Sequence, residues 1–135
     1  WSFIVINNQP ILEQAQRRIA TMGMNRFVKQ APVLIAIVLE KANLTASLGS
    51  VIKDKEYPLL DIGIAANNIW MQDTELRLGS CILGWFDEKG LKQLLDVPEN
   101  KRIPLVISLG YSAAITRKKI RKPLKEIVHF NSYKR

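Results

Sequence analysis

The sequence predicts a layered domain of mixed helices and strands, an α+β or α/β sandwich. Its strongest strand signal is Val33 to Leu39, an apolar run without polar alternation, which is typical of a strand covered on both faces. Helix-like and strand-like segments alternate along the rest of the chain. With 135 residues, 47% of them hydrophobic, the chain is long enough for one domain with a sizeable core and too short for two ordinary ones. We therefore expect residues 1–135 to form a single domain.

The first elements are a short strand and an amphipathic helix. Phe3 to Ile6 predicts the strand, and Asn8 follows it as a helix N-cap. Pro10 is tolerated in the first helical turn, because the hydrogen bond that a proline cannot make is absent there anyway. Apolar residues then recur at helical spacing up to a predicted end near Gly23, and these are Ile11, Leu12, Ala15, Ile19 and Met22.

Residues 57–87 predict a long helix that runs directly into a buried strand. One stripe at three- and four-residue steps consists of Leu59, Ile62, Ala66, Ile69 and, at its end, Asp73. A second apolar set lies off this stripe and consists of Leu60, Ile64, Trp70 and Met71. A helix that is apolar over more than half its circumference must be covered on two sides, so a partner subunit is expected against the second set. Gly79 is predicted to end the helix as a left-handed cap, and Cys81 to Phe86 to form the strand.

The remaining elements follow from caps and prolines. Residues 40–56 carry no clean periodicity and predict a mobile connection. Asp87 is predicted to cap a short helix, Glu88 to Leu95. The residues after Val97 are predicted to end this helix. Ile103 to Leu109 predicts another strand, with its proline near the start, where a missing donor costs least.

Positive charge is concentrated in the C-terminal tail. The net charge is +8, and residues 117–135 hold eight Lys or Arg against one Glu, which leaves +1 for the first 116 residues. Such a tail could hold a phosphate, touch nucleic acid or keep the protein soluble. Within it, Pro123 is predicted to open a last short helix, Leu124 to Phe130. The single cysteine, Cys81, excludes an intrachain disulfide, and no apolar leader or membrane-length run is present, so a cytoplasmic protein is expected.

The pattern from Asp61 onward resembles the nitroreductase family of FMN-dependent oxidoreductases. The matching positions occur in order, and they are Asp61, Ala65-Ala66, Leu78-Gly79-Ser80-Cys81, Gly84-Trp85-Phe86-Asp87, Leu94-Leu95, Val97-Pro98 and Leu109-Gly110-Tyr111. The resemblance covers about Ala31 to Phe130 and, more weakly, the part before it. It implies an α+β fold, a three-layer sandwich whose central, mostly antiparallel sheet is flanked by helices, and a homodimer. The family has a helical N-terminal segment ahead of the position of Trp1, so we expect this sequence either to be a fragment or to lack part of the expected site.

The resemblance also implies a function. It predicts an FMN-dependent oxidoreductase that transfers hydride from NADH or NADPH, through the flavin, to a nitroaromatic compound, a quinone or a related small acceptor. In such enzymes the flavin carries the chemistry and the protein supplies binding, orientation and electrostatics, so no catalytic side chain is expected. The family builds its flavin pocket from both subunits, and no nucleic acid, membrane or metal partner is implied.

Two of three implied flavin-binding segments lie at turns. The turn formed by Cys81, Ile82, Leu83 and Gly84 would lie along the isoalloxazine ring and offer a backbone donor, although Cys81 and Leu83 depart from the family pattern. A plain buried strand with a glycine bulge is the structural alternative. Asn25 and Arg26 would meet the pyrimidine edge of the ring, where Arg26 would attract the charge of the reduced flavin. A solvated polar turn is the alternative there.

The third implied segment is the basic tail. Lys119 and Arg121 match a Lys-x-Arg spacing that grips the FMN phosphate in the family, and alternation places both side chains on one side of an extended chain. On composition alone a solvated charge run would be favoured.

Two other functions stay open at this point. A nitroreductase-like dimer with a degenerate flavin site is suggested by the departures at Cys81 and Leu83. A basic nucleic-acid-binding module is suggested by the tail, which however lacks interleaved aromatic residues. Cys81 and the only histidine, His129, are better explained as packing and as a satisfied or solvent-facing side chain than as a catalytic pair.

Overall fold

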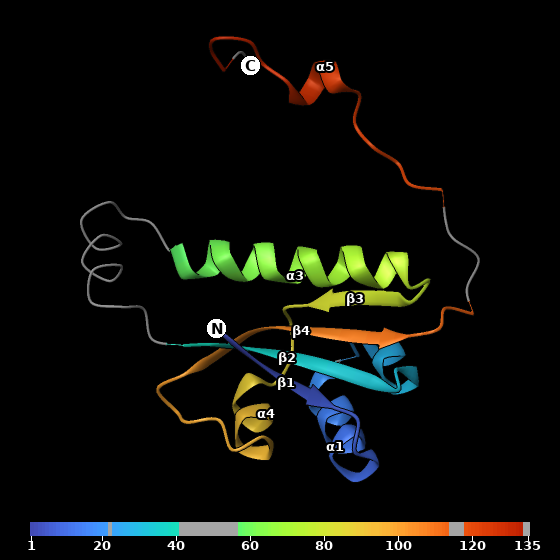
Figure 1. Cartoon of the computed structure of the whole chain (residues 1–135), viewed down its shortest axis with the longest axis vertical. Helices are drawn as coiled ribbons and strands as arrows, with labels where there is room; N and C mark the ends of the chain where they lie inside the picture. The colour runs from blue at the N-terminus through green and yellow to red at the C-terminus, as the bar shows by residue number, and fades with distance from the viewer. Residues whose placement is uncertain (22, 41–56, 114–117, 134–135) are drawn as a thin grey trace.

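A computed structural model describes residues 1–21, 23–40, 57–113 and 118–133 of the chain. Its centre is a four-stranded sheet in the order β1-β2-β4-β3, and each neighbouring pair is antiparallel. The strands are β1 (Ser2–Ile6), β2 (Val33–Leu39), β3 (Gly79–Leu83) and β4 (Arg102–Gly110). The long helix α3 (Tyr57–Glu75) covers one face, and α1 (Gln9–Ile19) and α4 (Glu88–Leu94) cover the other (Figure 1). The three-layer α+β sandwich with an antiparallel sheet is therefore confirmed.

The side chains of β2 and β4 divide between two hydrophobic clusters. Ile37 and Ile107 point toward α3 and pack with Ile62 and Ala66. The larger cluster, on the other face, combines residues of α1, α4 and the sheet. Because successive residues of a strand face opposite sides, a strand buried on both faces must be apolar throughout. The prediction that residues 33–39 form a central strand is confirmed.

The α3 helix buries only part of its apolar surface within the chain. Ile62 and Ala66 are buried as predicted, whereas Leu59, at the start of the predicted stripe, is 41% exposed. Asp73 is buried at the other end of the stripe, and its Oδ2 atom has no hydrogen-bond partner among the described residues. The second apolar set stays exposed, as expected for a face that none of the described residues covers, and comprises Leu60, Ile64, Trp70 and Met71.

The connection from α3 into β3 differs from the prediction. Arg77, not Gly79, holds the left-handed conformation, with φ 56°. The Leu78 N–H donates to the Asp73 carbonyl at 2.8 Å and the Arg77 N–H donates to the Thr74 carbonyl at 3.1 Å, the two hydrogen bonds of a Schellman motif. Gly79 is the first residue of β3. The glycine was misassigned because the motif needs one left-handed residue, and here that residue is an arginine.

The β3 strand is an edge strand, so the predicted buried strand from Cys81 to Phe86 is wrong in position and in burial. The observed strand is Gly79–Leu83, and among the described residues it pairs with β4 alone. Cys81 and Ile82 are exposed, whereas Leu83 is buried.

The other helices largely follow their predicted caps. The α1 helix begins after Asn8, whose side chain makes no capping hydrogen bond, and it ends at Ile19, earlier than predicted. Met22 and the connection 41–56 lie outside the described residues. Asp87 caps α4 by accepting a hydrogen bond from the Gly90 N–H at 2.9 Å, so that prediction is confirmed.

The last helix is shorter than predicted. It is α5 (Leu124–Ile127) rather than residues 124–130, and all of its side chains are exposed. A helix this short gains little without packing against another element. The tail that carries it leads away from the sheet and lies beyond α3 (Figure 1). Within the described ranges, no helix has the length and apolarity needed to cross a membrane.

Candidate functional site

A single hydrogen bond joins one predicted site segment to the residue that follows another. Asn25 Nδ2 donates to the Trp85 backbone carbonyl at 2.7 Å, although the two residues are 60 positions apart. Asn25 precedes the short 3₁₀ helix η1 (Arg26–Gln30), and Trp85 follows the end of β3. The structure therefore brings Asn25 and Arg26 next to the turn that begins at Leu83.

The η1 segment is anchored in the core. Its Val28 is fully buried, and the Val28 N–H donates to the Asn25 carbonyl at 3.0 Å. Gln16 of α1 donates through Nε2 to the Ala31 carbonyl at 2.9 Å and so ties the end of η1 to α1. Gln16 is buried and was missed in the sequence. Its position within the apolar spacing of Leu12, Ala15 and Ile19 was the available signal.

The alternation of β3 decides where its side chains point. Cys81 lies opposite Ser108, and Leu83 lies opposite Val106, which belongs to the α1 and α4 side of the core. Cys81 and Leu83 therefore share the η1 side of the sheet, and Ile82 faces the α3 side. Leu83 is buried, so any contact that it makes with a ligand would come from its backbone.

Gly84 is exposed and has room around it. A Cβ atom added there would meet nothing closer than Leu105 Cδ2 at 3.7 Å, an ordinary van der Waals distance. Packing within the described residues therefore does not require a glycine at this position.

Arg26 supplies a positive charge next to this turn. The residue is exposed and forms no ion pair with a described residue. A Cβ atom placed on Gly23, which has φ +78°, would lie 3.7 Å from Arg26 Nη2, so the guanidinium lies over the glycine. An unpaired guanidinium of this kind can attract a negatively charged or carbonyl-bearing ligand.

The Cys81 thiol is free but is not activated. Partial desolvation raises the pKa of the Cys81 thiol above its usual value, although the residue as a whole is exposed. The thiolate, which is the nucleophilic form, is therefore disfavoured at neutral pH. His129 is exposed in the tail and packs against the Tyr133 ring, with a centroid distance of 4.6 Å.

Lys119 and Arg121 are not brought to this place. Both are exposed in the segment that leads away from the sheet, and Figure 1 shows that segment beyond α3, on the other side of it from the sheet. The third predicted segment is thus separate from the first two within one chain.

Two hollows in the surface lie elsewhere. The larger, about 500 Å³, lies between α4 and the start of β4, and its Glu88 and Arg102 are engaged with each other. The smaller, about 310 Å³, lies between β1 and α3 and is lined largely by apolar side chains, including Trp1, Phe3 and Ile64. Neither contains a predicted site residue, so the candidate site rests on the Asn25 and Trp85 contact rather than on a cavity.

Comparison with known proteins links this arrangement to one family. The model of the nitroreductase family matches residues 1–111. An FMN-dependent nitroreductase from Clostridium difficile R20291 is 29% identical, with a TM-score of 0.76, over 98% of this chain and 76% of that chain. The NADPH:FMN oxidoreductase from Vibrio harveyi has a TM-score of 0.77 at 19% identity, over 99% of this chain and 60% of that chain, and this likeness shows the fold alone.

A curated protein of Streptococcus pyogenes serotype M6 is also similar. It is named as a candidate NAD(P)H nitroreductase and is 28% identical over 113 residues, which cover 83% of this chain and 54% of the relative. The chain thus spans about half the length of the curated relative that it matches.

Proposed function

Because this chain belongs to the nitroreductase family, we propose that it binds FMN and works as an oxidoreductase. The hydride would come from NADH or NADPH, and the electrons would pass to a nitroaromatic compound, a quinone or a related acceptor. The names of the Clostridium difficile and Streptococcus pyogenes relatives support the flavin and the nicotinamide. The fold and the free Cys81 thiol agree with a cytoplasmic location, which we also propose.

The observation that carries this proposal is the hydrogen bond from Asn25 to Trp85. The Asn25-Arg26 turn and the turn from Cys81 to Gly84 were assigned to different parts of one flavin ring from separate stretches of sequence, and this hydrogen bond joins Asn25 to Trp85, the residue after Gly84. A structural role alone would not require both predicted segments to meet at an exposed sheet edge. A flavin ring that contacts both turns requires that the two turns lie close together.

The described residues fit a flavin in their chemistry. Arg26 offers an unpaired cation, the turn after Leu83 offers backbone donors, and the open space at Gly84 allows a flat ring to approach the main chain. FMN, when bound, supplies the acceptance and donation of hydride. The tasks of Arg26 and the turn are to orient the ring and to balance its charge, and the tail cations Lys119 and Arg121 are assigned to its phosphate.

We further propose a homodimer built on the exposed face of α3. Leu60, Ile64 and Met71 are each at least 60% exposed, and they lie on one side of the helix at intervals of four and seven residues. An apolar face of this kind is typical of an interaction site. A dimer would also bring the tail of one subunit near the other, which would account for the separation of Lys119 and Arg121 from Asn25 in a single chain.

Reconstitution with FMN tests the proposed function. The purified protein should take up FMN in a flavin-fluorescence titration, and the loaded protein should oxidise NADH or NADPH in the presence of a nitroaromatic compound or a quinone. Uptake of FMN without oxidation of either nicotinamide would favour a degenerate site. Failure to take up FMN, together with salt-sensitive binding to DNA or RNA, would favour the nucleic-acid module instead.

A further inference from the structure

We propose that Asn25 is a positioning residue that holds the Gly84–Trp85 turn in the shape that binds FMN. This inference rests on the proposed function. The resemblance assigns the Asn25 amide to the flavin ring itself, whereas the structure gives that amide a partner within the protein, the Trp85 carbonyl at 2.7 Å. Asn25 would then act on the ligand through the turn.

The backbone of Asn25 is suited to this task. Its φ of 53° lies in the left-handed region, which asparagine adopts more readily than most side chains. This conformation lets the Asn25 carbonyl start η1 by accepting from the Val28 N–H at 3.0 Å while the side chain reaches toward Trp85. Since Val28 is fully buried, the amide is held from a rigid base.

The turn itself has few other restraints. A Cβ atom on Gly84 would meet only an ordinary van der Waals neighbour, Leu105 Cδ2 at 3.7 Å, and Trp85 is 62% exposed. The fixed points on either side are Leu83, which is buried, and Asp87, whose N–H donates to the Arg18 carbonyl at 2.9 Å. Between them, Phe86 packs at the edge of the core. The hydrogen bond from Asn25 is thus the one polar tie described for the Gly84–Trp85 turn.

The hydrogen bond from Asn25 to the Trp85 carbonyl also orients a backbone N–H donor. The Trp85 carbonyl and the Phe86 N–H belong to one planar peptide, so a hydrogen bond that orients the first also orients the second. Without this hydrogen bond, the wide conformational freedom of Gly84 would let the neighbouring peptide, between Gly84 and Trp85, rotate. The Phe86 N–H therefore keeps one direction only while Asn25 holds the Trp85 carbonyl.

Two substitutions test whether the donor of the Asn25 side chain holds the turn, rather than its backbone conformation or its shape. Asn25→Gly keeps the left-handed backbone and introduces no charge, but it removes the donor. Asn25→Asp keeps the shape of the side chain and its tolerance of the left-handed region, but it replaces the donor with an acceptor that repels the Trp85 carbonyl. Asn131→Asp is the matched control, because Asn131 has a similar φ of 64° and lies exposed in the tail.

The test measures backbone NMR order parameters in flavin-free protein and FMN affinity in the same variants. In both Asn25 variants, the order parameters of the amides of residues 84–86 should fall from the rigid range of about 0.85 to below about 0.6 while those of β4 stay unchanged, and the Kd for FMN should rise at least tenfold. Asn131→Asp should change neither. Weakened FMN binding with unchanged order parameters in the turn would mean that Asn25 touches the ligand directly, which overturns the positioning role.

The remaining outcomes separate this inference from the proposed function. Unchanged FMN affinity in both Asn25 variants, with wild-type protein that binds FMN, would overturn the inference alone. Wild-type protein that takes up no FMN would overturn the proposed function and the inference together.

Discussion

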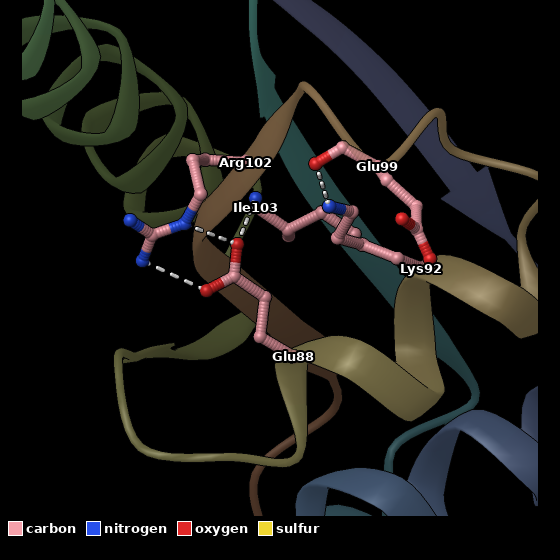
Figure 2. Close-up of polar contacts among 5 residues, drawn as sticks. All are labelled: Glu88, Lys92, Glu99, Arg102 and Ile103. Carbon is pink, nitrogen blue, oxygen red and sulfur yellow. Dashed lines mark hydrogen bonds and ion pairs between the residues drawn. The ribbon is translucent and has the colours of Figure 1, made fainter.

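Glu88 and Arg102 form a two-point ion pair that connects the start of α4 to the start of β4. Arg102 Nε donates to Glu88 Oε1 at 2.7 Å, and Arg102 Nη2 donates to Glu88 Oε2 at 2.8 Å (Figure 2). Glu88 Oε1 also accepts from the Ile103 N–H at 2.8 Å. The hydrogen bonds from the Arg102 side chain lower the pKa of the Glu88 carboxyl below its usual value, against the opposing effect of partial burial.

Because of this ion pair, the free energy of unfolding should fall at acid pH. Because the pKa of Glu88 is lower in the folded than in the unfolded chain, its contribution is complete above the unfolded value of roughly 4.3 and is lost as the pH falls through the folded value. We expect Glu88→Gln to lower the free energy of unfolding by about 1 kcal/mol near neutral pH, since solvent screens the exposed Arg102 side. Denaturant unfolding should show little difference from wild type well below the folded pKa.

Glu99→Gln is the control for this prediction. Its backbone carbonyl, not its carboxylate, accepts the hydrogen bond from Lys92 Nζ at 2.6 Å (Figure 2), so the substitution should leave that bond in place. An equal loss of stability from Glu88→Gln at neutral and strongly acid pH would show that the carboxylate charge is not the cause.

Arg77 holds a backbone conformation that glycine fits better. We expect Arg77→Gly to raise the free energy of unfolding by about 0.5–1 kcal/mol, because relief of left-handed strain outweighs the greater freedom of glycine in the unfolded chain. Arg77→Ala removes the same charge but keeps the strain, so it should bring no gain. Thermal or denaturant unfolding of the three proteins measures the difference, and a destabilised Arg77→Gly protein would contradict the assignment of strain.

Ile64 tests the proposed dimer face. It is 62% exposed on α3, and burial of such a side chain contributes roughly 1.5–3 kcal/mol. We expect Ile64→Glu to give monomers or aggregates in sedimentation at micromolar concentration and to release FMN. Gln72→Glu adds the same charge to an exposed polar position of the same helix and should do neither. A wild-type protein that is monomeric while still holding FMN would rule out both the interface and the shared pocket.

Lys119 and Arg121 test the assignment of the phosphate. Their joint replacement by Ala should weaken FMN binding strongly, because each charged hydrogen bond to a phosphate contributes roughly 1.5–3 kcal/mol. Joint replacement of Lys122 and Lys125 removes the same charge from the same tail and should have a much smaller effect. If the two pairs weaken binding equally in a fluorescence titration, the tail acts only through its overall charge.

Local patterns in the sequence determined most of the elements. The apolar run at residues 33–39 fixed the central strand, because a strand with helices over both faces has no polar side. Asp87 fixed the start of α4, since a cap depends on residues only three positions apart. Spacing alone separated the two apolar sets of α3, although Leu59 of the first set is exposed together with the second.

Tertiary structure decided what depends on strand order and on distant contacts. The residues near 81–83 were predicted to form a strand, but not an edge strand, because strand order depends on pairings between residues far apart in the sequence. The left-handed residue at the end of α3 was assigned to Gly79 from composition, whereas the turn geometry selected Arg77. The sequence named Asn25 as a site residue by resemblance, yet its hydrogen bond to Trp85 spans 60 positions, and a contact at that separation exists only once the sheet has brought the two turns together.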